Sequence, residues 1–439
     1  MTLSPHLAPH LATHPAHRSA CGWQALLPAR PPGPSQRGDE RAELVIVGAG
    51  YTGVAAARAY QALAPERRVV MLEAERVGDG SPGRNSGFML EIALANDASS
   101  GALSRMATLN RLSREAMASL KAQVDTHAID CQLTRSGTYR AARGAAGRAA
   151  LASYAEFLHA AGLDYYSLDR AALAERLGTD YYAEGLYSPD CYLVQPAALI
   201  RGLVAALPPA VTCYEQSPAL SLTRDGDGDG WRVSTPQGEI RTRQVMLANN
   251  AFARALGADR SRLTAIYTYA ALTAPLTPAH TAAVAGTPWG LLPAHRLGCT
   301  LRTTADRRLM IRAQYDYERE RDPTTVAAAL AASLTARYPA LADVGFERVW
   351  GGTTGLTYNG APLWGEIGPG LYVSAGCNGG GIVKGSVLGE ALARLALGRP
   401  TEDIPALFGR ASWMPPAPIR RLAFEAIRRV EQRRGREEA

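Results

Sequence analysis

The chain has 439 residues, enough for more than one domain, and its 47% hydrophobic and 20% charged residues are those of an ordinary globular protein. No apolar run approaches the roughly 18 residues of a membrane-spanning helix, so we expect no membrane partner. The formal charge of +7 permits a nucleic-acid partner without requiring one. Six cysteines without C-x-x-C spacing are typical of free thiols in a reducing compartment, and we expect a cytoplasmic protein.

The first 40 residues are rich in proline, alanine and histidine, and they lack the basic start and sustained apolar core of a secretory signal. Four histidines, His6, His10, His14 and His17, have no acidic or cysteine partners nearby, so we expect no metal site. The segment is predicted to be a flexible leader, in which Trp23–Pro28 is a candidate for docking on the body.

The first predicted strand, Leu44–Val47, runs directly into a glycine turn and a helix. Gly48, Gly50 and Gly53 form the pattern G-x-G-x-x-G. Gly48 permits the tight turn, Gly50 lets the backbone approach a pyrophosphate, and Gly53 lets the helix pack closely on the strand. Glu73 ends a second strand about 20 residues later, where an acid binds a ribose hydroxyl, and it favours an adenosine without a 2′-phosphate. The motif predicts a dinucleotide site and leaves NAD and FAD as alternatives.

A glycine-dense loop, Gly78–Phe88, follows the second strand. Its small polar residues beside a dinucleotide site favour contact with the cofactor over a plain turn, and the Arg84 guanidinium is available to a phosphate or a ring. Helical and alternating patterns then predict the helix Leu103–His127, the strand Cys131–Arg140, the helix Ala149–Ala161, short strands within Tyr181–Val194, and the helix Leu199–Leu207.

The next segments, Val211–Leu222 and Trp231–Thr235, alternate as a meander. Its turn, Asp225–Gly230, resembles a calcium loop but lacks the downstream glutamate and the flanking helices, so we predict a solvated hairpin. Gln244–Ala251 is predicted to be a buried strand that ends in small polar residues, as at the carboxyl end of a cofactor sheet.

A second sheet is predicted from the strands Ile266–Leu276 and Leu309–Tyr315, with the helix Thr325–Tyr338 after them. Leu371–Gly381 then runs from a strand into a second glycine loop, which begins a helix ending at Leu397. The positive end of that helix dipole would favour an anion in front of it.

The last stretch, Ile419–Arg436, is a basic amphipathic helix in which Leu422, Ile427 and Val430 lie opposite a row of arginines. Because it has so few large apolar residues, we expect it to dock on the protein itself or on a partner rather than on lipid.

Four motifs in this order carry a resemblance to a known family: the first glycine pattern, Gly83-Arg-Asn-Ser-Gly87, Ala248-Asn-Asn250 and Gly376-Cys-Asn-Gly-Gly-Gly381. Over residues 41–400 the chain resembles the D-amino-acid oxidase superfamily of FAD-dependent oxidoreductases. The Tyr-Thr-Gly of the first motif, the Gly-Arg-Asn loop and Ser-Ala-Gly-Cys are most similar to its γ-glutamylputrescine oxidase branch. The resemblance implies FAD as the cofactor.

The resemblance also implies an α/β fold with an α+β second domain. A Rossmann-like FAD-binding domain would be interleaved with an antiparallel-sheet substrate domain that covers the flavin. We expect a flexible leader at 1–40, the discontinuous FAD-binding domain at 41–100, 190–262 and 346–400, the substrate domain at 101–189 and 263–345, and a basic helical tail at 401–439.

The implied FAD-binding residues come from six separate stretches of the chain. They are Gly48, Gly50, Tyr51, Thr52, Gly53, Glu73, Ala74, Gly83, Arg84, Asn85, Ser86, Gly87, Ala219, Ala248, Asn249, Gly376, Asn378, Gly379, Gly380, Gly381 and Ile382. The resemblance places the second glycine loop at the flavin ring, where the helix dipole would favour the anionic reduced ring.

Two departures from the family pattern bear on the substrate. Amino-acid-oxidising relatives carry an arginine that binds the substrate carboxylate in the passage equivalent to Trp350–Pro362, where this chain has Thr353, Thr354 and Gly355. A simple α-amino acid would therefore lack its ion pair. Gly380 stands where the branch often has histidine, so the catalytic acid or base stays open.

Three residues are candidates for catalysis. Lys384 follows the second glycine loop, with a solvated or phosphate-facing lysine as the alternative. Tyr267 and Tyr269 share one face of a strand and would suit an alkylamine, and Tyr315 and Tyr317 repeat the arrangement. Ordinary sheet packing is the alternative for each tyrosine.

We therefore predict an FAD-dependent amine oxidoreductase. A primary or secondary amine, such as a polyamine derivative, would lose a hydride to flavin N5, the imine would hydrolyse, and oxygen or another electron carrier would reoxidise the flavin. The alternatives are an amino-acid oxidase of the D-amino acid, glycine or sarcosine type, and a dehydrogenase that passes electrons to a quinone or carrier. A non-catalytic flavoprotein subunit and a tRNA-linked oxidoreductase belong to other classes. Because the basic charge lies mostly in the tail, we expect no nucleic-acid partner.

Overall fold

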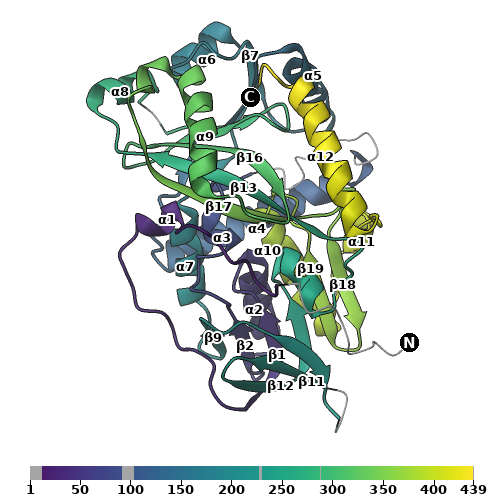
Figure 1. The fold of residues 1–439 in the computed structure, drawn as a ribbon. Coiled ribbons are helices and arrows are strands. Elements are labelled where there is room, and N and C mark those ends of the chain that lie inside the picture. Colours follow the sequence, from purple (N-terminus) through teal and green to yellow (C-terminus); the bar gives the residue numbers. More distant parts are fainter. Residues whose placement is uncertain (1–11, 91–102, 227–229, 287, 439) are drawn as a thin grey trace.

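The computed structural model describes residues 12–90, 103–226, 230–286 and 288–438. Within these ranges the chain forms two eight-stranded sheets and a small three-stranded sheet. The first large sheet lies in the lower half of Figure 1 and the second lies above it. The predicted α/β fold with a second antiparallel part is thereby confirmed. Over the described residues, no helix is long and apolar enough to cross a membrane.

The first sheet has the strand order β10-β11-β12-β1-β2-β9, with β19 paired to β12 and β18 paired to β19. Its parallel strands are β1 (Glu40–Val47), β2 (Val69–Leu72), β9 (Val211–Tyr214), β12 (Gly238–Leu247) and β19 (Leu371–Ala375). Its antiparallel strands are β10 (Ser221–Arg224), β11 (Trp231–Thr235) and β18 (Leu363–Gly368). Successive residues of β1 are buried on both faces, as expected for a parallel strand covered on two sides.

The second sheet has the order β17-β13-β16-β15-β14-β5-β7-β6 and is antiparallel except where β14 meets β5. Its strands are β5 (Thr138–Ala142), β6 (Tyr166–Asp169), β7 (Glu184–Ser188), β13 (Thr264–Thr273), β14 (Gly290–Pro293), β15 (Thr300–Thr303), β16 (Leu309–Tyr317) and β17 (Phe346–Leu356). The small sheet joins β3 (Phe88–Met89), β8 (Tyr192–Leu193) and β4 (Thr134–Arg135).

Helices α2 and α10 pack on the first sheet, and α9 packs on the second. α2 (Tyr51–Leu63) and α10 (Val383–Ala396) share a core with β1, in which Ile46, Tyr60 and Leu392 are fully buried. α9 (Pro323–Arg337) packs Leu330 against Ile311 of β16. The other helices are α1 (Gly22–Ala25), α3 (Ser81–Arg84), α4 (Leu103–Thr126), α5 (Ala145–Ala160), α6 (Arg170–Leu177), α7 (Pro196–Ala205), α8 (Pro278–Ala283), α11 (Ile404–Phe408), α12 (Ala417–Arg434), and the short 3₁₀ helices η2 (Asn250–Leu256) and η3 (Pro339–Leu341).

Within residues 12–40, the part of the leader that the structure describes, Trp23 of the docking candidate Trp23–Pro28 packs on the body of the protein. Trp23 in α1 is fully buried and meets Trp350 of β17 edge to face, with ring centroids 6.1 Å apart. Its indole N–H donates to the carbonyl oxygen of Asn85 at 2.8 Å. One large aromatic side chain buries enough area to hold a polar segment in place, which composition alone does not reveal. Residues 1–11 lie outside the described ranges.

Three further features concern single elements. β17 pairs with β13, so residues 346–356 form a strand of the second sheet. α4 buries Met117 and Leu120 in the core of the first sheet, because helical periodicity marks an apolar face but not the sheet that covers it. The expected strand Cys131–Arg140 is divided into β4 and β5 at Gly137, which has φ +62°. The predicted turn Asp225–Gly230 includes residues 227–229, which lie outside the described ranges.

The basic tail docks on the second sheet, along the right-hand side of Figure 1. Phe424 of α12 packs on Tyr317 of β16 with ring centroids 5.7 Å apart. Arg420 donates to the carbonyl oxygen of Arg260 at 3.1 Å, and Glu431 pairs with His295 at 3.1 Å. These contacts place α12 against its own protein.

Candidate active site between the two sheets

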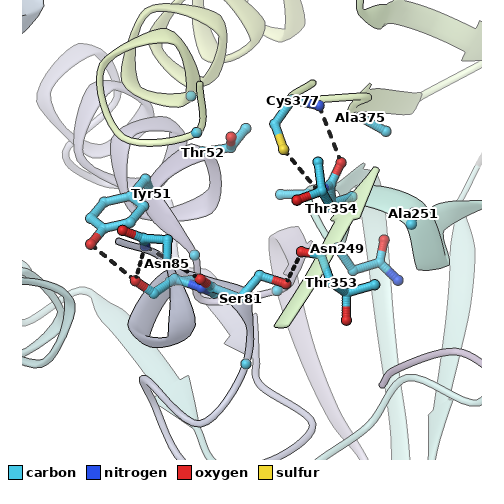
Figure 2. Close-up of a pocket in the computed structure, with 18 of the residues that line it drawn as sticks. Tyr51, Thr52, Ser81, Asn85, Asn249, Ala251, Thr353, Thr354, Ala375 and Cys377 are labelled. Carbon is cyan, nitrogen blue, oxygen red and sulfur yellow. Dashed lines mark hydrogen bonds between the residues drawn. The ribbon is translucent and has the colours of Figure 1, made fainter. Parts of the chain in front are cut away.

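A pocket lies where the carboxyl ends of the parallel strands face the second sheet. The first sheet contributes the ends of β1, β2 and β19, and the second contributes residues of β14, β16 and β17. Figure 2 shows Tyr51 and Thr52 of α2 on one side of this pocket, with Ala375 and Cys377 on the other. Open α/β sheets bind their ligands at this edge.

The first glycine turn has the geometry that its sequence pattern predicts. Gly48 has φ +105°, and a Cβ there would lie 3.0 Å from the carbonyl oxygen of Ala248. A Cβ on Gly53 would collide with the carbonyl oxygen of Gly48, so only glycine lets α2 pack this close to the turn. Gly50 precedes α2 in an extended conformation and lines the pocket. The unpaired N–H groups at the start of α2 are therefore available to an anion there.

Glu73 lines the pocket immediately after β2. Its carboxylate accepts hydrogen bonds from the backbone N–H of Ala49 at 3.1 Å and of Glu75 at 3.2 Å. Burial raises the pKa of Glu73 to about 7, although these two N–H groups favour the charged form. The carboxylate is thus held beside the glycine turn, where the sequence predicts a ribose acceptor.

Arg84 does not reach the pocket, contrary to the expectation that it contacts a phosphate or the ring. Its guanidinium donates to the carbonyl oxygens of Gly351 at 2.9 Å and Ser19 at 2.8 Å, and to that of Asp79. Arg84 therefore ties α3 to β17 and to the N-terminal segment. Its neighbours Asn85 and Ser86 line the pocket instead, because the short α3 turns the arginine inward.

Asn250, the first residue of η2, hydrogen-bonds the second glycine loop. The side-chain oxygen Oδ1 of Asn250 accepts a hydrogen bond from the backbone N–H of Gly376 at 2.9 Å. The side-chain nitrogen Nδ2 of Asn250 donates to Cys377 Sγ at 3.2 Å. Within the loop, the side chain of Asn378 donates to the carbonyl oxygen of Gly376 at 2.7 Å. Gly379 and the two residues after it line the pocket just before α10.

Most of the residues expected to bind the cofactor meet at this pocket. The lining includes Gly48, Gly50, Tyr51, Thr52, Glu73, Ala74, Asn85, Ser86, Ala219, Ala248, Asn249, Gly379, Gly380, Gly381 and Ile382. The remaining expected residues are not part of the lining and shape the turns that carry it: Gly53, Gly83, Arg84, Gly87, Gly376 and Asn378.

Tyr267 and Tyr269 do not line the pocket, which corrects the expected aromatic wall. Both belong to the core between the second sheet and α9. The Tyr269 hydroxyl donates to Asp316 at 2.8 Å and accepts from the backbone N–H of Arg321 at 2.6 Å. Strand alternation correctly predicts that the two tyrosines share a face, but it cannot say which face the pocket meets.

Lys384 lines the pocket in the first turn of α10 and is only 2% exposed. Its ammonium donates to the carbonyl oxygen of Gly360 at 3.4 Å and lies 5.5 Å from the centre of the Phe408 ring. This burial excludes the solvated alternative and keeps Lys384 a candidate for the reaction.

Sequence reasoning misses several residues of the pocket. Phe88, Leu90 and Leu292 form apolar walls, and Arg312 of β16 adds a positive charge. A signal for Arg312 exists in the sequence, because it is the one charged residue in the run Leu309–Tyr315. The apolar residues carry no such signal, since the same types fill the core.

Two features of the lining suit a dinucleotide cofactor: buried polar atoms without partners, and free space beside Gly379. Ser86 Oγ and Asn249 Oδ1 are buried without a hydrogen-bond partner among the described residues. Such atoms are costly unless a ligand satisfies them. A Cβ on Gly379 would meet nothing within 4 Å, so the second loop leaves room for a ligand beside its backbone.

Comparisons with known proteins agree with this geometry. The family model described as FAD dependent oxidoreductase (DAO) matches residues 43–395. The chain is 27% identical to the probable oxidoreductase OrdL of Rhizobium meliloti (strain 1021), over 87% of this chain and 89% of that protein. It is 24% identical to the gamma-glutamylputrescine oxidoreductase of Escherichia coli (strain K12), over 81% of this chain and 84% of that protein.

A solved structure shows the same fold. Glycine oxidase from Geobacillus kaustophilus superimposes with a TM-score of 0.72 at 21% identity, over 85% of this chain and 98% of that chain. The resemblance stated from the motifs is confirmed, FAD is the cofactor, and the protein is an enzyme. The chain belongs to the DAO family of FAD-dependent oxidoreductases.

Proposed function

We propose that the enzyme oxidises the C–N bond of a primary or secondary amine, and that the imine product hydrolyses to a carbonyl compound. The observation that carries this proposal is a single pocket with two kinds of lining. The glycine turn and Glu73 line it together with the apolar side chains of Phe88, Leu90 and Leu292. A relative whose name gives an amine substrate, the gamma-glutamylputrescine oxidoreductase, supports the choice.

Three parts of the chain would hold the cofactor. The N-terminus of α2 would receive the pyrophosphate, Glu73 would accept from the ribose, and the Gly379–Gly381 loop would lie along the ring. FAD supplies the hydride acceptor at its N5 and passes the electrons to oxygen or another carrier. The positive end of α10 faces the pocket and would stabilise negative charge on the ring.

The apolar walls would prepare the amine for oxidation. An ammonium cannot give up a hydride from the carbon next to its nitrogen, so the substrate must lose a proton first. Because Phe88, Leu90 and Leu292 lie against the site, they would lower the pKa of an amine held there and favour its neutral form.

Oxidation of an amino acid is the second candidate. Thr353 and Thr354 occupy the place of the expected carboxylate-binding arginine, which speaks for a plain amine. Arg312 favours a substrate with a carboxylate, because it brings a positive charge to the same pocket from another strand.

Anaerobic stopped-flow mixing tests the proposal. The purified holoenzyme is mixed with primary amines, secondary amines, α-amino acids and α-hydroxy acids, and the loss of the oxidised flavin spectrum is followed. We expect bleaching by members of the amine or amino-acid series and none by hydroxy acids. Bleaching by hydroxy acids alone would refute the proposal. Admission of air afterwards, with a measurement of hydrogen peroxide, separates an oxidase from a dehydrogenase.

A further inference from the structure

Arg312 brings a positive charge into the pocket from the interior of the second sheet. β16 places it opposite Ala270 of β13 and Thr300 of β15, so its strand is covered on both edges. The residues beside it in sequence, Ile311 and Ala313, are buried and apolar. A lone arginine in such a strand is costly to bury, and buried charges are normally paired.

The buried arginines of the described structure are hydrogen-bonded or ion-paired, whereas Arg312 is half-buried in the pocket lining and has no hydrogen bond or ion pair among the described residues. Arg302 donates to the carbonyl oxygen of Val194 at 2.7 Å, and Arg337 donates to that of Glu438 at 2.6 Å. Arg308 forms ion pairs with two carboxylates. Among the described residues, the groups that act on the charge of Arg312 are Tyr315 and Cys377, and neither is a carboxylate. Burial accordingly lowers the pKa of Arg312.

The charges that line the described pocket are unevenly placed. Glu73 stands after β2, where two backbone N–H groups hold it, and it is absent from the groups that act on Arg312. The lysine and arginine residues of the lining are Lys384 of α10 and Arg312 of β16, and the ammonium of Lys384 contacts the Gly360 carbonyl oxygen and the Phe408 ring. Arg312 therefore brings to the lining a positive charge that an anion on the ligand would pair.

We propose that Arg312 binds a carboxylate of the substrate, so that the substrate is an amine and an acid in one molecule. The amine half rests on the proposed function. A guanidinium presents a planar fork of N–H donors that matches a carboxylate with two parallel hydrogen bonds. The family resemblance places the carboxylate-binding arginine in the passage that begins in β17, whereas Arg312 lies on β16. Because β13 lies between these two strands, the backbones of β16 and β17 are about 10 Å apart. Arg312 would therefore hold the carboxylate at another wall of the pocket.

Binding of a matched pair of probes to the oxidised holoenzyme tests this assignment. Propionate and propionamide have the same size and shape, but only propionate carries a charge. Their affinities are measured from the perturbation of the bound flavin spectrum and from the rise in melting temperature, at constant ionic strength. We expect propionate to bind roughly 10- to 100-fold more tightly than propionamide, the range of charge-assisted hydrogen bonds.

Three variants locate the charge that is responsible. Arg312→Met is expected to bind both probes equally, and Arg312→Lys is expected to keep part of the preference because it keeps the charge. Lys384→Met, which removes the other cation of the lining, is expected to keep the preference. Flavin content and melting temperature without probe show that each variant is folded.

Three results would overturn the assignment. They are equal binding of the two probes by the wild type, a preference that survives in both Arg312 variants, and a preference that disappears only with Lys384. A changed flavin reduction potential in Arg312→Met, with the preference for propionate intact, would assign the charge to the cofactor instead. None of these measurements requires turnover, so they can be read even where no amine reduces the flavin.

Discussion

Gly53 in α2 lies directly against the carbonyl oxygen of Gly48, so closely that a Cβ on Gly53 would collide with it. We predict that Gly53→Ala pushes α2 away from the turn and costs at least about 2 kcal/mol of stability, in the range of overpacking. Because the N-terminus of α2 lines the pocket, the same change should weaken FAD retention. Thermal unfolding and the flavin content of the purified variant measure both effects.

Gly345→Ala is the matched control for this prediction. A Cβ on Gly345 meets nothing within 4 Å, and the residue is exposed. It should unfold within about 0.5 kcal/mol of the wild type and keep its flavin. Equal stability and equal flavin content of the two variants would show that the close contact between Gly48 and Gly53 contributes to neither property.

Glu73 predicts a pH dependence of FAD binding. Because burial raises its pKa to about 7, the carboxyl is protonated below that pH in the protein without FAD. A ribose hydroxyl donates to the charged form, so binding must displace the proton, and affinity should rise about ten-fold between pH 6 and pH 8 and then level off. Fluorescence titration of the apoprotein with FAD measures this. Glu73→Gln should bind more weakly with no such slope, and a slope that persists in it would place the titrating group elsewhere.

Trp23 anchors the N-terminal segment beside the pocket. It is fully buried against Trp350 and donates to the carbonyl oxygen of Asn85, a pocket residue. Trp23→Ala should cost about 3–5 kcal/mol by loss of buried aromatic contact. Trp413→Ala, at a tryptophan that is 61% exposed, should change stability by about 0.5 kcal/mol or less. Calorimetric melting of both variants measures the two losses of stability. Similar losses would mean that residues 12–40 do not support the fold.

Tyr269 is expected to stabilise the fold rather than to take part in catalysis, because it lies in the core and outside the pocket lining. Tyr269→Phe leaves Asp316 and the backbone N–H of Arg321 without the hydroxyl that they share, and it should cost about 1–2 kcal/mol. The ring stays in its core, so kcat/KM should change by about two-fold or less. A loss of ten-fold or more in kcat/KM, with the melting temperature unchanged, would return Tyr269 to the catalytic candidates.

The sequence predicts local features of the site better than long-range ones. Gly48, Gly53 and Glu73 could be placed because their roles depend on short spacing within one strand-turn-helix unit. The side chain of Arg84 could not, because its partners Ser19 and Gly351 are far from it in the chain. The same limit hides the bond from Asn250 to Cys377, which joins residues 127 positions apart.

The second sheet shows a different limit. Its strands could be recognised from alternation, but the pleat does not reveal which face meets the pocket. Tyr267 and Tyr269 therefore drew attention as aromatic pairs, whereas Arg312, a single charge in an apolar run, lines the pocket. A lone charge in a buried strand is the more specific signal, because aromatic residues are common in sheets and unpaired buried charges are rare.

Product stoichiometry in a single anaerobic turnover tests the proposed reaction most directly. The holoenzyme is mixed with one equivalent of an amine that bleaches it, and the reduced flavin and the released carbonyl compound are quantified together. We predict one carbonyl per flavin reduced, and no bleaching by the alcohol that replaces the amine nitrogen with oxygen. Flavin reduction without a carbonyl product, or faster reduction by the alcohol, would contradict oxidation of a C–N bond.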